Sequence, residues 1–322
     1  MNRTFKLVLV SVLAVTLQAC GGGGGGGGGG NNSNANPPPA NPPASTDPLG
    51  PVGTTAEEQV RLIEAVGEEV LAVLYIDFDT AAEALQSAAA SYCADPASGD
   101  FAALQSSWRQ AMNAWQQAQF LRVGPVDEEA RLERIQFFPD RSRVVGPTVD
   151  DLLAANTPIT EASIAIAPVQ AQGLPALEYL LFVIGGLDDV TDGPRRCDLA
   201  TAIADNLATM AGDLAEAWGP GGTFIVEFTT GTGDSFDDVE DVLIAILETI
   251  AVQAEQIGDR KLQDAFLAGD VEQLESFRSE NSNSNVDNNI EALQKLFDDD
   301  DDDTYRVRDY LERAHMAEPI TA

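Results

Sequence analysis

Apolar residues recur at helical spacing along most of the chain after residue 54. The period holds over residues 55–76, restarts over 79–93 and resumes over 100–119. Residues three and four apart share one face of a helix, so each segment predicts an amphipathic helix. Thr55, with Glu58 three residues later, predicts a capping box at the first helix start. The pattern favours an all-α bundle of about ten helices.

The second half of the chain continues this pattern with one interruption. Long helices are predicted over 195–218 and 237–262, and another from about residue 285 to 297. Between the first two, residues 223–232 are rich in Gly and Thr and contain the strand-like run 224–226. This composition predicts a loop over the bundle.

One segment has almost no polar face. Residues 170–182 read Gln-Ala-Gln-Gly-Leu-Pro-Ala-Leu-Glu-Tyr-Leu-Leu-Phe. Proline suits a first helical turn, so a helix is predicted to start at Leu174 or Pro175 and to end at residues 185–186. A helix that is apolar all round is buried. Glu178 within it must be protonated, paired or bound to a cation, because burying a bare charge is prohibitive. Glu178 is therefore the strongest candidate for function.

The N-terminus has the features of a lipoprotein signal. Arg3 and Lys6 precede the apolar run 7–17, and Leu-Gln-Ala then leads to Cys20. This arrangement predicts a signal peptide over residues 1–19, with Cys20 left as a lipid-bearing N-terminus.

A low-complexity stretch follows the predicted lipidation site. Residues 20–53 consist mainly of Gly, Asn and Pro and predict a flexible tether, and residues 54–322 form the expected helical domain. Gly21 rather than an aspartate follows the cysteine, which indicates the outer membrane. We expect a lipid-anchored protein on the periplasmic side of that membrane, with the bilayer as its first partner.

Charge and cysteine content narrow the partners and the compartment. Without Arg3 and Lys6 the mature chain keeps 16 bases against 52 acids, a net charge of −36. Such a chain repels nucleic acid and anionic lipid, so both are excluded as partners. Cys93 and Cys197 remain besides Cys20 and predict a disulfide in an oxidising compartment, although a reactive or metal-bound pair is an alternative.

Several motifs resemble those of the imelysin-like (M75-type) family, whose members are periplasmic lipoproteins often tied to iron acquisition. Residues 173–178, Gly-Leu-Pro-Ala-Leu-Glu, resemble the family's Gly-x-His-x-x-Glu, with Pro175 at the histidine position. The branch of predicted periplasmic lipoproteins is most similar. Residues 108–116, 134–140 (Arg-Ile-x-Phe-x-Pro-Asp) and 275–282 (Glu-Ser-x-x-Ser-x-Asn-Ser) match further family signatures.

The resemblance implies two packed helical bundles with a ligand at their junction. Family members commonly carry another helical pair after the last matched helix, so the domain is expected to be shortened at its C-terminus. Arg134 or Arg278 is expected to face Glu178, and a metal at Glu178 is considered. The residues expected at the ligand site are Glu178, Gly173, Gln172, Arg134, Asp140, Arg278, Ser279 and Ser282.

Three functions follow as hypotheses. The first is a non-catalytic lipoprotein that binds a small ligand, iron or an iron chelate in iron uptake or its regulation, with an iron-transport system as a further partner. The second is a structural or partner-binding lipoprotein in which Glu178 sits in a closed ion pair. The third is a metallopeptidase, which Pro175 opposes because a catalytic zinc needs about three protein ligands.

Overall fold

All regular structure in the described residues, 47–97, 99–183, 193–298 and 303–317 of a computed structural model, is helical. The all-α fold predicted from the hydrophobic period is thereby confirmed. The longer helices are α1 (Thr55–Ala65), α2 (Ala72–Ala94), α3 (Phe101–Ala118), α5 (Val145–Ala154), α7 (Gly173–Phe182), α8 (Gly193–Trp218), α9 (Thr223–Thr230), α10 (Val239–Glu255), α12 (Ser282–Phe297) and α13 (Val307–Ala317). Short elements are α4 (Arg131–Ile135), α6 (Glu161–Ala165) and α11 (Asp264–Ala268), with π-helices at Val66–Leu71 and Gln256–Gln263.

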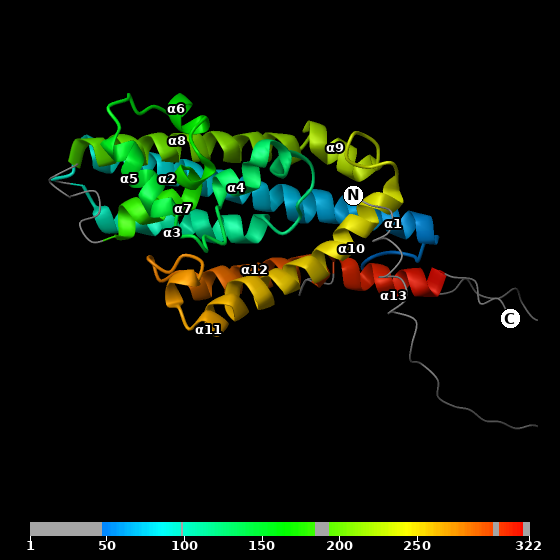
Figure 1. Cartoon of the computed structure of the whole chain (residues 1–322). Helices are drawn as coiled ribbons and strands as arrows, with labels where there is room; N and C mark the ends of the chain where they lie inside the picture. Colours follow the sequence, from blue (N-terminus) through cyan, green and yellow to red (C-terminus); the bar gives the residue numbers. More distant parts are fainter. Residues whose placement is uncertain (1–46, 98, 184–192, 299–302, 318–322) are drawn as a thin grey trace, which may run out of the picture. The chain divides into compact units, whose positions relative to one another are not determined.

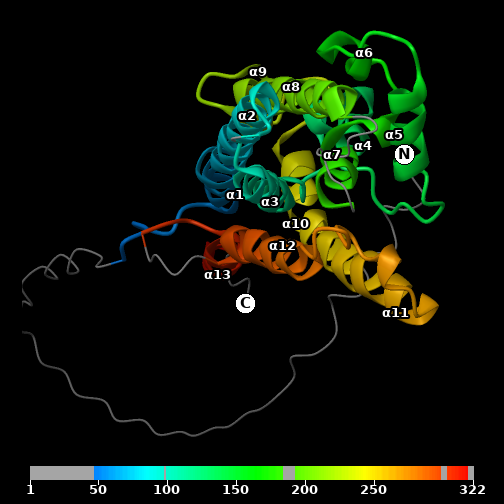
Figure 2. The ribbon, with the colours of Figure 1, turned by 90° about the vertical axis from the view of Figure 1, so that its left-hand side faces the viewer.

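Helix α2 is the centre of the packing. It contacts α3 and α8 along its length, and α7 packs against both of these neighbours. Helix α12 covers the other side of α3, and α10 runs beside α12, so that these two form a separate layer in both views (Figures 1 and 2). The site-bearing helix α7 therefore lies close to the boundary between the α2–α3–α8 group and the α10–α12 layer.

Trp108 holds α7 in place and is one of three fully buried tryptophans. Trp108 and Trp115 of α3 and Trp218 of α8 have no exposed surface. The indole Nε1 of Trp108 donates to the carbonyl oxygen of Leu174 at 2.9 Å, and its ring meets Phe182 edge-on. Both ends of α7 are thus tied to α3. The helix begins at Gly173, one residue before the predicted start, and ends at Phe182; the predicted end at 185–186 lies outside the described residues.

The first two predicted helices are one continuous helix. The expected break near residue 77 is absent there, because Tyr75 and Phe78 are both buried and keep the helical period through it. The irregularity in this continuous helix lies earlier, in the π-helix Val66–Leu71, whose wider turns hold more residues than those of an α-helix. The capping box is one residue from its predicted place, since Thr54, not Thr55, accepts from the backbone N–H of Glu57 at 3.2 Å.

The loop predicted over residues 223–232 is wrong. Residues Thr223–Thr230 form α9, which buries Phe224, Ile225 and Phe228 on one face and ends at Gly231. The β-branched residues suggested a strand, but burial at positions separated by one and four residues is helical, and tertiary packing overrides a weak local propensity.

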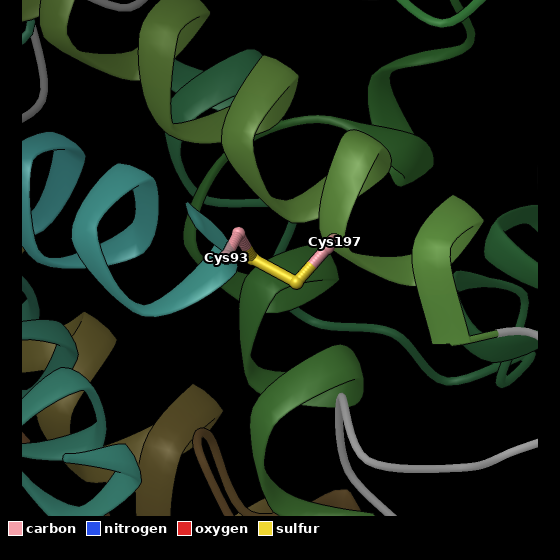
Figure 3. Close-up of a disulfide and its surroundings, with 2 residues drawn as sticks. All are labelled: Cys93 and Cys197. Atoms are coloured by element: carbon pink, nitrogen blue, oxygen red, sulfur yellow. A yellow bond between two sulfur atoms is a disulfide. The ribbon is translucent and has the colours of Figure 1, made fainter. Parts of the chain in front are cut away.

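The predicted disulfide is confirmed. Cys93 at the end of α2 is bonded to Cys197 in the first turns of α8, with their Cα atoms 5.4 Å apart (Figure 3). The bond joins the two helices that make the largest contact of the bundle.

The C-terminal helix closes on the start of the folded region. The guanidinium of Arg313 in α13 pairs with Glu58 at 3.2 Å and with Asp47 at 2.7 Å, and it donates to the carbonyls of Gly50 and Pro51. Among the described residues, contacts with α13 begin at Asp47. Within the part of the chain that the structure describes, no helix combines the length and apolar character needed to cross a bilayer.

Candidate functional site

The first residue of α7 requires glycine. Gly173 has φ +64°, a left-handed value that other residues adopt at a cost, and a Cβ there would lie 2.3 Å from the carbonyl oxygens of Arg134 and Ile135. The absence of a side chain lets α7 start directly against the end of α4. Gly173 therefore positions the helix, and through it Glu178.

Glu178 is buried, with 3% of its surface exposed, and its carboxylate has partners. Its Oε1 accepts from the backbone N–H of Ser279 at 2.9 Å and lies 2.8 Å from Ser279 Oγ. Its Oε2 lies 3.7 Å from Arg278 Nη1. The loop between α11 and α12 thus supplies these contacts of the carboxylate, although it is distant from α7 along the chain.

Burial is the largest influence on Glu178. It raises the pKa of the carboxyl group above its ordinary value, while the hydrogen bonds from Ser279 and the charge of Arg278 oppose the rise without cancelling it, and the nearby Glu275 adds to it. The group accordingly holds a proton at a higher pH than an exposed glutamate. Ser279 Oγ also lies 3.1 Å from the carbonyl of Ser276, so its hydroxyl has a second acceptor when Glu178 is protonated.

Arg278 is held by aromatic faces. Its guanidinium carbon lies 4.4 Å from the ring centroid of Phe277 and 5.5 Å from that of Tyr179. Flat guanidinium groups are attracted to such ring faces. The ion pair with Glu178 at 3.7 Å is longer than a hydrogen bond, so the pair neutralises charge without closing a tight contact.

A cavity of about 50 Å³ opens beside this pair. That volume exceeds the roughly 10–15 Å³ that one water needs and is far below the roughly 300–1,000 Å³ of a drug-sized site. The wall includes Glu178, Arg278, Asp140 and Pro175. Pro175 stands where the family motif has histidine, so this part of the wall offers no side-chain atom that could bind a metal.

Arginine is the commonest charged residue around this cavity. Arg141, Arg143, Arg260 and Arg278 all line it. Three of them are neutralised, Arg141 by Asp264, Arg143 by Asp270 and Glu272, and Arg278 by Glu178. Among the described residues, Arg260 is the cavity arginine that has no ion pair, and it is exposed.

The other residues predicted for the site divide into two groups. Asp140 lines the cavity, although both of its oxygens already accept backbone N–H groups of Val144 and Val145 at the start of α5. Ser282 is turned away, since its hydroxyl donates to the carbonyl of Glu275 at 2.6 Å. Gln172 is committed to structure: its amide nitrogen donates to the carbonyl of Ala167 at 2.7 Å.

The expectation that Arg134 faces Glu178 is wrong. Arg134 Nε donates to the side-chain oxygen of Gln172 at 3.0 Å, and its guanidinium lies 3.9 Å from Glu129. The α4 helix ends at Ile135 and turns Arg134 toward the residues before α7, whereas the alternative partner, Arg278, approaches Glu178 from the far loop.

A second buried polar cluster adjoins the cavity and was missed in the sequence. Lys261 donates to Glu275 at 2.7 Å and to Gln116 at 2.6 Å, and Gln136 and Asn285 donate to Glu275 as well. Burial lowers the pKa of Lys261, and the charge and hydrogen bond of Glu275 oppose this. The signals available were Glu275, first residue of the Glu-Ser-x-x-Ser motif, and the rarity of lysine in the chain, which has three.

The family model for imelysin (peptidase M75) matches residues 74–322. The chain belongs to the imelysin family. The resemblance inferred from residues 173–178 is therefore confirmed, and the match spans α7, the cavity and the loop that contacts Glu178. No curated protein matches the chain.

Two crystal structures have a similar fold. An imelysin-like protein from Psychrobacter arcticum 273-4 has a TM-score of 0.64 and 21% identity, over 76% of this chain and 75% of that one. A "putative iron-regulated protein A precursor" from Parabacteroides distasonis ATCC 8503 has a TM-score of 0.68 and 18% identity, over 82% and 81%. At these identities the likeness establishes the imelysin fold alone.

Proposed function

We propose that this imelysin is a periplasmic lipoprotein, anchored to the outer membrane through Cys20, that binds a small anionic ligand or an iron chelate in iron uptake or its regulation. The cavity beside Glu178 carries the proposal. Four arginines and five acidic side chains line it, and each of these acids already has a partner other than Arg260. Arg260, exposed and without an ion pair among the described residues, is the group proposed to meet the charge of the ligand.

A chelate suits this cavity better than a bare metal ion. Glu178 is already paired with Arg278, and a neighbouring guanidinium repels a cation. Pro175 offers no ligand atom, and the described residues contain no group of three His, Cys, Asp or Glu side chains placed to hold a metal. The residues present therefore do not fit a protein-bound zinc or iron centre, and they support no peptidase step.

The size of the cavity limits what enters it. Its enclosed part accommodates a carboxylate-sized group, and the remainder of a larger ligand would lie at the mouth, near Arg141 and Arg260. Ferric citrate has the required chemistry, because its peripheral carboxylates are ligands for arginine. Haem is too large for the enclosed part.

The test is a thermal-shift screen on the mature chain, residues 20–322, with Cys20→Ser. The probes are ferric citrate, citrate alone, Fe²⁺, Fe³⁺, Zn²⁺, Ca²⁺ and haem. A ligand bound only by the native state at a hundred times its dissociation constant adds about 2.7 kcal/mol, or about 5–10 °C in a domain of this size. We expect a shift with ferric citrate that Arg260→Ala and Glu178→Gln reduce.

Arg308→Ala is the matched control, because Arg308 is a partly exposed arginine on α13 and has its own acidic partner, Asp298. It should keep the full shift. Equal shifts in all three variants would place binding elsewhere, and a shift with citrate alone would show that iron is not needed.

A second candidate function rests on the contacts of Glu178 itself. Ser279 and Arg278 already satisfy the carboxylate, as a structural or partner-binding lipoprotein requires. Buried ion pairs of this kind occur without any chemistry. This alternative predicts no shift with any probe, together with a Glu178→Gln protein whose melting temperature alone has changed.

A further inference from the structure

The end of the α10–α11 arm carries a group of exposed apolar side chains. Phe266 is 84% exposed, Leu267 and Val271 are each 71% exposed, and Leu262 is 47% exposed. These four residues are here named the apolar tip. Figures 1 and 2 both place α11 at the outer edge of the ribbon. Contiguous exposed apolar groups on a soluble domain mark a contact surface.

Local geometry gathers the tip. Ala265 is the residue that α11 buries, so Phe266 and Leu267 project from its other sides. Gly269, at φ +61°, ends the helix, and the N–H of Asp270 returns to the carbonyl of Ala265 at 3.2 Å. This αL turn keeps Val271 within one turn of Phe266. Nothing in the packing of the core requires large apolar residues at these positions.

Three acidic side chains beside the tip are paired with arginines. Asp264 pairs with Arg141, and Asp270 and Glu272 pair with Arg143. In a chain with a formal net charge of −34, this makes the surroundings of the tip suited to an uncharged surface. The exposed neighbours without an ion pair among the described residues, Asp259 and Arg260, carry opposite charges, so the surroundings of the tip have no excess of one sign for a strongly basic or strongly acidic partner.

The length of residues 20–46 indicates which uncharged surface the tip can reach. This step rests on the proposed anchoring through Cys20. Residues 20–46 reach at most about 90 Å, whereas the helical run from α10 to α11, 239–268, is about 45 Å long. The anchor therefore allows the tip to reach the bilayer, and a tether makes even a weak second contact effective.

We propose that the apolar tip inserts into the neutral lipid surface of the bilayer to which Cys20 is anchored. Phe266 and Leu267 enter the headgroup region, and Val271 and Leu262 lie at its edge. Asp264 begins α11 and also lines the cavity, so this contact orients the mouth of the cavity toward the membrane.

The experiment attaches the mature chain to phosphatidylcholine vesicles through the Cys20 thiol and a maleimide lipid. The other two cysteines are joined in the disulfide, so Cys20 is the thiol that reacts. Amide hydrogen exchange is compared between the vesicle-bound chain and the same chain with Cys20 capped in solution. We expect several-fold slower exchange over residues 262–271 on vesicles, and loss of this protection in Phe266→Ser with Leu267→Ser.

Ile166→Ser is the matched control, because Ile166 is 87% exposed but lies apart from the tip in sequence, after α6. It should leave the protection unchanged. Unchanged exchange over 262–271 on vesicles would overturn the proposal, and so would protection that appears without vesicles as protein concentration rises, since that is self-association. Because the chain is coupled chemically, the experiment does not depend on natural lipidation of Cys20. Ligand binding is measured separately, by thermal shift on Phe266→Ser with Leu267→Ser. Loss of the ligand shift would count against the proposed function, whereas loss of protection over 262–271 concerns the tip alone.

Discussion

At the scale of single residues, Gly173 makes a sharp prediction. An alanine there combines φ +64° with a Cβ 2.3 Å from two backbone carbonyls, so α7 must shift or strain. We expect Gly173→Ala to lower the free energy of unfolding by about 2 kcal/mol or more, measured by urea denaturation. Gly258→Ala is the control: apart from its chain neighbours and its own helix backbone, no atom lies within 4 Å of its added Cβ, and alanine favours helix by about 1 kcal/mol.

Glu178 predicts a specific dependence on pH. Burial raises the pKa of Glu178 in the folded protein above the ordinary 4.5. At pH values between 4.5 and this raised pKa, the native state therefore binds a proton that the unfolded chain has lost. The free energy of unfolding of the wild type should therefore rise, relative to Glu178→Gln, as the pH falls through the raised pKa toward 4.5. Urea denaturation of both proteins between pH 7 and pH 4.5 measures this, and parallel curves would contradict it.

At the scale of elements, the Arg313 contact decides whether α13 stays on α1. The side chains of Arg313 and Glu58 are 4% and 2% exposed. Arg313→Ala leaves the buried Glu58 without its cation, so it should cost about 3 kcal/mol and speed amide exchange in α13. Arg308→Ala removes a half-exposed pair on the same helix and should cost less than about 1 kcal/mol. If both variants lost the same free energy of unfolding, the Arg313 contact would not be what holds α13 on α1.

The same contact should respond to acid in the opposite sense from Glu178. Burial raises the pKa of Glu58, but hydrogen bonds from Tyr305 and Gly53 and the charge of Arg313 outweigh it, and the pKa lies below its ordinary value. A lowered carboxyl pKa stabilises the fold above that ordinary value and ceases to do so as the pH falls through the folded pKa. Release of α13 is thus expected on the acid side of pH 4.5.

At the scale of the whole molecule, the disulfide constrains the unfolded chain. It links residues 104 apart, which in the chain-entropy model corresponds to about 4–5 kcal/mol. Cys93→Ala with Cys197→Ala should lower the melting temperature by about 8–20 °C, measured by calorimetry. Cys20→Ser, which keeps the bond, should leave it unchanged. A fall of only a degree or two would mean that reduced chains keep residual structure near these helices.

Most of the helices, the buried position of α7 and the burial of Glu178 followed from the sequence. Helical period is a local property, because residues three and four apart meet on one face whatever the rest of the chain does. An apolar segment with one carboxylate likewise predicts that the carboxylate is buried and has a partner, but it does not identify that partner. The disulfide was predictable for a different reason: once Cys20 is assigned to lipidation, a single pairing remains.

Tertiary structure alone decided which groups meet. Ser279 and Arg278 reach Glu178 across about a hundred residues, while Arg134, much closer in sequence, turns to Gln172. Residues 223–230 became helix because Phe224 and Phe228 share a buried face, against their local preference. The cavity and the cluster of Lys261, Glu275 and Gln116 also depend on contacts distant in sequence. Sequence patterns encode which face of an element is buried, but its partner is chosen by the packing of the complete chain.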